Sequence, residues 1–199
     1  MAKYVKTEQG YIDMLSFAQT TANNAKSEAL DLAARMFGHT SVADNAFRFD
    51  NTLSITSLPA CIESIGYNAF QGCTNLALTS LPSWLTSISN SAFQGCTNLA
   101  LTSLPSRLTS IGYNVFQDCT NLALTSLPSG LTSIGNGAFQ NCTKLTSITF
   151  TGKPTSIANN VFEGCTNLTT INVPWAEGEV ANSPWGATNA TINYNYTGA

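Results

Sequence analysis

The chain has 199 residues, of which 43% are hydrophobic and only 10% are charged, and its net charge is −3 at pH 7. A typical soluble domain carries roughly 25% charged residues, so hydroxyl and amide side chains must keep this surface hydrated. The few, scattered basic residues give no electrostatic footprint for nucleic acid. No stretch approaches the roughly 18 apolar residues of a membrane span. We expect one large domain, or a domain with an appendage, and neither a nucleic-acid partner nor membrane insertion.

Residues 8–37 predict one long helix, because they lack proline and are rich in alanine, and Gly38 is a suitable stop. Apolar or small residues recur in them with heptad spacing, which is typical of a coiled coil. The residues expected to form the oligomerisation seam are Leu15, Ala18, Ala22, Ala25, Ala29, Leu32 and Met36. We assign residues 1–40 to an anchor that forms a homo-oligomer, for example a trimer, or docks onto a larger assembly. The alternative is a helix that caps the first repeat.

From residue 41 onward the sequence is repetitive, and the spacing from Phe70 to Phe93 recurs as a constant 23-residue period. Each unit is too short to bury its own apolar positions, but stacked units place Phe on Phe and Leu on Leu and form one continuous core. Residues 41–173 are therefore predicted to form a solenoid. The recurring phenylalanines are Phe70, Phe93, Phe116, Phe139 and Phe162, and the recurring cysteines are Cys73, Cys96, Cys119, Cys142 and Cys165.

Residues 174–199 are predicted to form a closing repeat. The segment Trp185-Gly-Ala-Thr-Asn-Ala-Thr-Ile resembles Glu163-Gly-Cys-Thr-Asn-Leu-Thr-Thr-Ile with one residue missing. A terminal unit has to expose one face to solvent, which agrees with a copy whose sequence departs from that of the other repeats.

The unit Leu-Thr-Ser-Ile-Gly-Asn-Gly-Ala-Phe-Gln-Asn-Cys-Thr-Lys-Leu-Thr-Ser-Ile, residues 131–148, closely resembles the BspA-like subfamily of leucine-rich repeats. The resemblance covers roughly residues 46–173 and implies an α/β solenoid of leucine-rich repeats. It also implies a role in attachment, since members of this family are often bacterial surface proteins that bind host matrix proteins. Related repeats occur in gut bacteria and their phages.

Three units depart from this pattern and read Leu-Ala-Leu-Thr-Ser-Leu-Pro. They carry Thr79, Thr102 and Thr125 where the last units have Ile148 and Ile171. We expect this difference to change how the strand face packs without disturbing the register of the repeats.

Six cysteines could form disulfides or a metal site, but their spacing favours neither. Zinc sites normally use local Cys-x-x-Cys pairs, and the sequence contains none. Five equivalent positions in one column cannot all pair with one another. We expect these five to be buried thiols that pack as small hydrophobic residues. We expect Cys61, which lies outside the column, to be open to solvent.

The sequence offers no catalytic constellation. Its single histidine, His39, lies before the repeats, and it has neither a Gly-x-Ser-x-Gly elbow nor a glycine-rich phosphate loop followed by Lys and Ser or Thr. Serine and threonine are abundant but have no base to activate them. We expect no enzymatic activity, no cofactor and no bound metal.

Comparison of the repeats with one another identifies two variable columns. The column after each Leu-Pro reads Cys61, Trp84, Arg107, Gly130 and Lys153, and the other reads Tyr67, Asn90, Tyr113, Asn136 and Asn159. A position that accepts Trp, Arg and Gly is exposed, since no core slot tolerates all three, and Trp, Tyr and Arg are enriched at binding hot spots. The alternative is that both columns are merely unconstrained surface. The predicted ligand-binding residues are Trp84, Arg107, Lys153, Tyr67 and Tyr113.

These observations predict a non-catalytic attachment protein. Its solenoid would bind a protein or glycan ligand, and its N-terminal helix would anchor it to an oligomer or a larger assembly such as a phage fibre. The alternatives are a structural or decorating subunit with no external ligand, and a cytoplasmic interaction scaffold. The first ten residues lack the apolar core of a secretory signal. We therefore expect the chain on a virion, or on a cell surface as part of an assembly, with the cytoplasm as the alternative.

Overall fold

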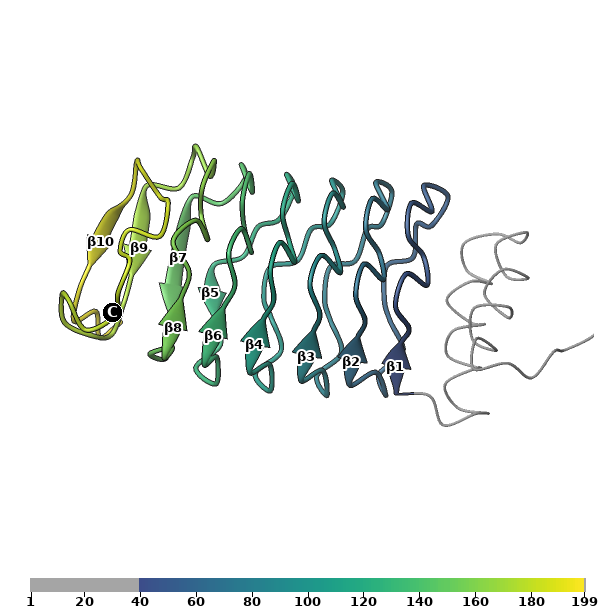
Figure 1. The fold of residues 1–199 in the computed structure, drawn as a ribbon, viewed down its shortest axis with the longest axis horizontal. Helices are drawn as coiled ribbons and strands as arrows, with labels where there is room; N and C mark the ends of the chain where they lie inside the picture. Colours follow the sequence, from purple (N-terminus) through teal and green to yellow (C-terminus); the bar gives the residue numbers. More distant parts are fainter. Residues whose placement is uncertain (1–39, 199) are drawn as a thin grey trace, which may run out of the picture.

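The computed structural model describes residues 40–198, which form a stack of coils, each one repeat long (Figure 1). The predicted helix of residues 8–37, with its seven seam residues, lies outside these described residues, as does His39. The described part consists of strands and turns and contains no helix. The predicted solenoid, with its 23-residue repeat, is therefore confirmed, but its α/β class is wrong for residues 40–198, because each coil closes through turns and not through a helix.

One parallel sheet of six short strands runs along a face of the stack, and we call it sheet A (Figure 1). Each strand pairs with the equivalent strand of the next coil, so that Ser64 lies beside Ser87 and Ile65 beside Ile88. The isoleucine or valine points into the core and the serine faces outward, as the two-residue period of a strand requires. The six strands are β1 (Ser41–Val42), β2 (Ser64–Ile65), β3 (Ser87–Ile88), β4 (Ser110–Ile111), β6 (Ser133–Ile134) and β8 (Ser156–Ile157).

A second parallel sheet, sheet B, is confined to the C-terminal half. Its strands, in spatial order, are β10 (Thr191–Asn193), β9 (Thr170–Asn172), β7 (Ser147–Phe150) and β5 (Ser126–Leu127). The Leu-Ala-Leu units bury leucines two residues apart, as at Leu122 and Leu124, whereas the next unit buries Leu145 and Ile148, three apart.

At the next buried position the two kinds of unit are in register again. There Leu127 pairs with Phe150, and the offset is one repeat, as it is between the strands of sheet A. The expected change in packing on this face, without a change in register, is therefore confirmed.

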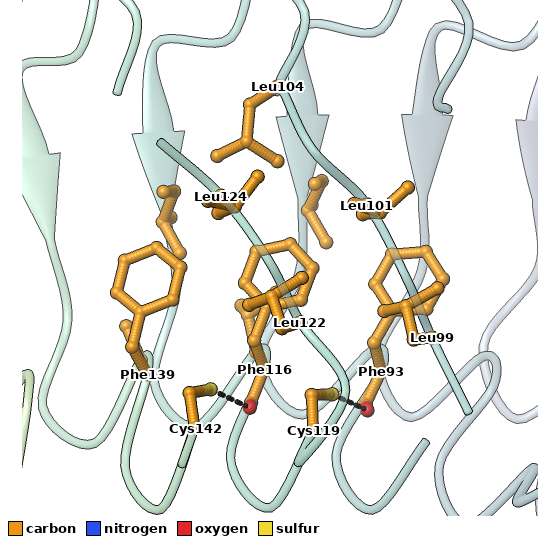
Figure 2. Close-up of a cluster of buried hydrophobic side chains, with 14 of the residues drawn as sticks. Phe93, Leu99, Leu101, Leu104, Phe116, Cys119, Leu122, Leu124, Phe139 and Cys142 are labelled. Atoms are coloured by element: carbon orange, nitrogen blue, oxygen red, sulfur yellow. Dashed lines mark hydrogen bonds between the residues drawn. The ribbon is translucent and has the colours of Figure 1, made fainter. Parts of the chain in front are cut away.

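The centre of the molecule is a ladder of six stacked phenylalanines, one in each coil from Phe47 to Phe162. Neighbouring ring centroids lie 5.1–5.6 Å apart, with interplanar angles of 1–10°. Figure 2 shows three rungs of this ladder, Phe93, Phe116 and Phe139, packed against leucines of the neighbouring strand face. All six rings are at most 2% exposed and belong to one continuous core.

The coils that carry Phe47 to Phe139 turn sharply on both sides of the phenylalanine, where two residues adopt left-handed backbone conformations with φ between +53° and +73°. Glycine, asparagine and aspartate tolerate this region best, which explains the recurring Asn-Ala-Phe-Gln-Gly motif. These conformations also prevent a helix from forming there. Phe49 is the bulky exception, and its ring covers the space that a Cβ would occupy at Gly72.

Side-chain amides link the coils next to these turns. Arg48 Nε donates to Gln71 Oε1 at 2.7 Å. Gln71, Gln94 and Gln117 then each donate to the equivalent glutamine of the next coil, at 2.5–2.9 Å. The ladder satisfies half-buried amides between coils without the use of charged pairs, which suits a chain with so few charges.

Three aromatic residues close the C-terminal end of the core. Phe150 packs edge-on against Phe162 and Trp175, with ring centroids 6.5 and 5.3 Å apart, and also contacts Trp185, at 5.8 Å. Strand β10 pairs with β9 at the edge of sheet B, so that Ile192 lies beside Ile171. Fewer residues separate Ile171 from Ile192 than separate Ile171 from Ile148, its partner in the preceding coil. The final coil is therefore shorter than the others, as its sequence indicated. The division between solenoid and closing repeat at residue 173 stays a prediction.

Replacement of Phe116 by alanine tests the ladder. The change leaves a cavity beneath rings on both sides, so we expect the free energy of unfolding to fall by about 3–5 kcal/mol. Urea denaturation followed by circular dichroism measures this loss. Tyr113→Ala, an exposed aromatic in the same coil, is the matched control and should change stability by less than about 0.5 kcal/mol. A loss below about 1 kcal/mol for Phe116→Ala would show that the ring is not a core element.

Candidate recognition surface

The two variable columns lie on either side of sheet A. One column stands three residues before the serine of each strand, as Trp84 does before Ser87, and the other stands three residues after it, as Tyr67 does after Ser64. Both columns are thus arranged along the same five strands of sheet A, β2, β3, β4, β6 and β8. The parallel register places equivalent residues of adjacent coils about 4.8 Å apart.

Trp84 and Arg107 are brought into direct contact. The Arg107 guanidinium carbon lies 4.2 Å from the centroid of the Trp84 ring, within the range of a cation–π interaction. Trp84 is 51% exposed, so the pair projects into solvent. In the same column, the coil after Arg107 carries Gly130, which has no side chain. The coil before Trp84 carries Cys61, which is half-buried and therefore less exposed than the sequence predicted.

Lys153 does not join this pair. Its Nζ donates to Glu179 Oε2 at 3.1 Å, in an exposed ion pair with the closing repeat. Exposed pairs of this kind are typically worth less than about 1 kcal/mol. Gly130 separates Lys153 from Arg107 by one coil, so the structure splits the predicted column into two parts.

Tyr67 and Tyr113 are 48% and 59% exposed. The amide of Tyr67 donates to Asp44 Oδ1 at 2.7 Å, and that of Tyr113 donates to Asn90 Oδ1 at 2.9 Å. The residue before each tyrosine is glycine, because a Cβ there would collide with the aspartate or asparagine oxygen.

At two places this column therefore couples neighbouring coils. Asp44 and Asn90 each accept from the tyrosine amide of the next coil, whereas Asn136 is followed in the next coil by Ala158 and Asn159. The sequence contained this signal as an Asp or Asn in one repeat and a Gly-Tyr pair at the equivalent place in the following repeat, but comparison of single columns missed it.

Between the two columns lies a strip of hydroxyl side chains that the search for variable columns also missed. Thr86 Oγ1 donates to the Glu63 carbonyl at 3.0 Å, and Thr132 Oγ1 donates to the Thr109 carbonyl at 3.0 Å. Ser87 and Ser110 are half-buried, and among the described residues their hydroxyls have no side-chain hydrogen bond. The signal for this strip was the near-invariant Thr-Ser before each core isoleucine.

The five ladder cysteines are buried, and no cysteine of residues 40–198 is in a disulfide. Each thiol also donates to the carbonyl of the phenylalanine in the preceding coil, with S···O distances of 2.9–3.1 Å (Figure 2). The sequence predicted burial but not these hydrogen bonds.

Burial raises the pKa of the Cys96, Cys119 and Cys142 thiols well above their ordinary value, and raises that of Cys165 to about 11. The cause is desolvation, since a thiolate in the core would lose its hydration. Such thiols are poor nucleophiles and poor metal ligands in the folded state.

No group of three or more His, Cys, Asp or Glu side chains that could hold a metal ion occurs within residues 40–198. The same part of the chain has no helix long and apolar enough to cross a membrane. What the described residues do offer is a repetitive surface with exposed aromatic and cationic side chains on one face.

This architecture is that of a leucine-rich-repeat solenoid, a class suited to protein binding or surface recognition and generally non-catalytic. Residues 40–175 match the family model of the BspA type leucine-rich repeat region, in six copies. The chain therefore belongs to the BspA-type leucine-rich-repeat family.

The chain is similar to several solved structures. For a leucine-rich-repeat protein of T. pallidum, the identity is 36% and the TM-score 0.58, over 67% of this chain and 65% of that one. This chain thus spans less than two thirds of that relative.

Two other solved structures match less well. A leucine-rich-repeat protein of Bacteroides ovatus is 30% identical, with a TM-score of 0.39, over 56% of this chain and 35% of that one. A leucine-rich cell surface protein of Faecalibacterium prausnitzii is 19% identical, with a TM-score of 0.36, over 67% of this chain and 58% of that one. No curated protein matches this chain.

The thiols of Cys96, Cys119, Cys142 and Cys165 predict a loss of stability in alkaline solution. In the unfolded chain they ionise near the ordinary pKa of 9.0, whereas in the folded protein their raised pKa keeps them protonated, up to about 11 for Cys165. Above pH 9 the unfolded state therefore binds fewer protons, and the free energy of unfolding falls as the pH rises. Each thiol is expected to contribute up to about 1.4 kcal/mol per pH unit.

Urea denaturation at pH 7.5, 9 and 10 measures this slope. In the Cys119→Ala variant the free energy of unfolding should fall less steeply with pH than in the unmodified chain, because one titrating thiol is absent. Equal slopes for the two proteins would contradict the assignment of the effect to the thiols.

Proposed function

We propose that this solenoid is a non-catalytic recognition module whose binding site lies on the N-terminal half of sheet A. The site consists of Tyr67, Trp84, Arg107 and Tyr113, and we call it the β2–β4 patch. The observation that carries the proposal is that three exposed aromatic rings and an arginine stand on three adjacent coils, beside β2, β3 and β4. Aromatic residues and arginine dominate binding energies at interfaces.

The remaining coils of sheet A lack these side chains. Beside β6 and β8 the two columns carry Gly130, Lys153, Asn136 and Asn159, and Lys153 is engaged by Glu179. The patch is therefore a local departure from the polar surface of these two columns. A second exposed pair, Arg48 at 4.8 Å from the Phe49 ring centroid, lies outside the two columns, next to the turns of the first coil. A protein or glycan displayed on a cell or particle surface is the proposed ligand.

We also propose that residues 1–40 anchor the solenoid in a homo-oligomer or a larger assembly, of which a phage fibre is one example. The support is the heptad spacing of seven small or apolar residues in this segment. Such an arrangement would present several patches at once, and multivalency raises avidity without new contacts. The chain would then be located on the surface of a cell or a virion.

The double variant Trp84→Ser, Arg107→Ser tests the recognition site. Labelled full-length protein is applied to printed panels of surface glycans and extracellular proteins, and bound signal is measured by titration. We expect the double variant to lose roughly tenfold or more in affinity, as hot-spot truncations do. Its melting temperature should stay close to that of the unmodified chain, because Gly130 already shows that this column tolerates a small residue.

The matched control is Lys144→Ser, Tyr196→Ser. It removes one cation and one exposed ring at positions away from sheet A, and should leave binding unchanged. Equal binding by both double variants and the unmodified chain would reject the β2–β4 patch. It would favour a structural or decorating subunit without an external ligand.

The variant Leu15→Asp, Leu32→Asp tests the anchor. Two buried charges in a heptad seam oppose helix association, so a chain that elutes as an oligomer in size-exclusion chromatography with light scattering should become a monomer of 21.1 kDa. Thr7→Asp, Glu8→Gln, outside the seam, is the control and should leave the oligomer intact. A monomeric unmodified chain would contradict self-association through this segment.

A further inference from the structure

The three aromatic side chains of the β2–β4 patch are separate plates and not a cluster. Tyr67 and Tyr113 lie on one side of the serine strip, two coils apart, and Trp84 lies on the other side, beside the coil between them. Two coils correspond to about 9.6 Å along the stack. Within the described residues, none of these three rings contacts another ring. The plates therefore flank a surface instead of forming one apolar anchor.

The floor between the plates is hydroxylic. Thr86 and Thr109 are exposed, and Ser87 and Ser110 are half-buried with hydroxyls that lack side-chain partners within residues 40–198. A protein hot spot is usually a packed apolar centre from which water is excluded. A polar floor with aromatic plates at its margins instead matches a carbohydrate chain, whose rings offer apolar C–H faces for stacking and hydroxyls for hydrogen bonding.

The position of Arg107 favours a ligand that carries a negative charge. Its guanidinium lies over the Trp84 ring at 4.2 Å, and no carboxylate of the described residues pairs with it, in contrast to Lys153, whose Nζ lies 3.1 Å from Glu179. The donors of a guanidinium lie in its plane, and within the described residues those of Arg107 make no hydrogen bond to the protein. The next coil carries Gly130, so no side chain of this column covers the far side of Arg107.

The charges on the floor give the ligand a direction. Glu63, the one carboxylate in the threonine column, stands on the β2 coil, two coils before Arg107. An acidic group of the ligand is therefore repelled at the β2 end and attracted at the β4 end, next to Gly130.

From this arrangement we infer that the ligand of the β2–β4 patch is a glycan chain bearing carboxylated sugars, with a carboxylate held in the fork of Arg107 and sugar rings stacked on the aromatic plates. The inference rests on the proposed function, because it names the ligand class of that same site. Bidentate arginine–carboxylate bonds are stronger and more directional than bonds to neutral groups, so the carboxylate sets the specificity.

The intrinsic fluorescence of Trp84 reports binding in the full chain. The other two tryptophans, Trp175 and Trp185, are at most 3% exposed, so a ligand at the patch perturbs Trp84 selectively. The probes are oligogalacturonate, a glucuronate-containing oligosaccharide and a sialylated oligosaccharide. Methyl-esterified oligogalacturonate keeps the rings without the charge, and hexaglutamate keeps the charge without the rings.

At least one acidic oligosaccharide should bind saturably, with its affinity reduced roughly tenfold by esterification and with no saturable binding of hexaglutamate. Arg107→Gln should abolish the preference for acid over ester, and Arg107→Lys should restore it only in part. Trp84→Ala should weaken acid and ester alike, and Lys144→Gln should change neither.

Three results would overturn the inference: no change in Trp84 fluorescence with any of the acidic sugars, equal binding of acid and ester, or binding of hexaglutamate as tight as that of the sugars. If one of these occurs while the Trp84→Ser, Arg107→Ser variant loses a protein ligand on the panels, the proposed recognition function stands and the glycan assignment fails. If that double variant binds every panel ligand normally, both fail.

Discussion

In-register stacking of coils, each offset from the next by one repeat, is the constraint on which the whole structure depends. It aligns the phenylalanine rings 5.1–5.6 Å apart, close to the separation of paired strands, so that one residue type fills the same slot in every coil. The same offset directs the thiol and amide hydrogen bonds, which all run from one coil to the next. A slip in this register would separate all these partners at once.

This constraint divides the surface from the interior. Inside, each slot is bounded by equivalent residues above and below, so Phe, Cys and Leu recur with little variation. Outside, a side chain has neighbours only along its column, and Trp, Arg and Gly can follow one another. Beside β2, β3 and β4 these exposed columns carry Tyr67, Trp84, Arg107 and Tyr113, the residues of the β2–β4 patch.

The scarcity of charge follows from the same geometry. Identical charges in neighbouring coils would stand about 4.8 Å apart and repel one another along the whole column. Neutral amides and hydroxyls avoid this repulsion and bond to their counterparts in the next coil, as the glutamine ladder does. Against such a background a single arginine stacked on Trp84 creates a distinct local potential.

The sequence by itself determined the repeat length, the core columns and the burial of the ladder cysteines, because these follow from periodicity. It also determined the exposure of Trp84, because the position of Trp84 accepts Arg and Gly in other repeats. Only the tertiary structure decided that the coils close through left-handed turns without a helix, and that sheet B is limited to the C-terminal half. It also decided that Arg107 rests on Trp84 while Lys153 turns to Glu179. These features depend on which side chains meet across coils and at the closing end, and a one-dimensional pattern of residue types does not contain those distances.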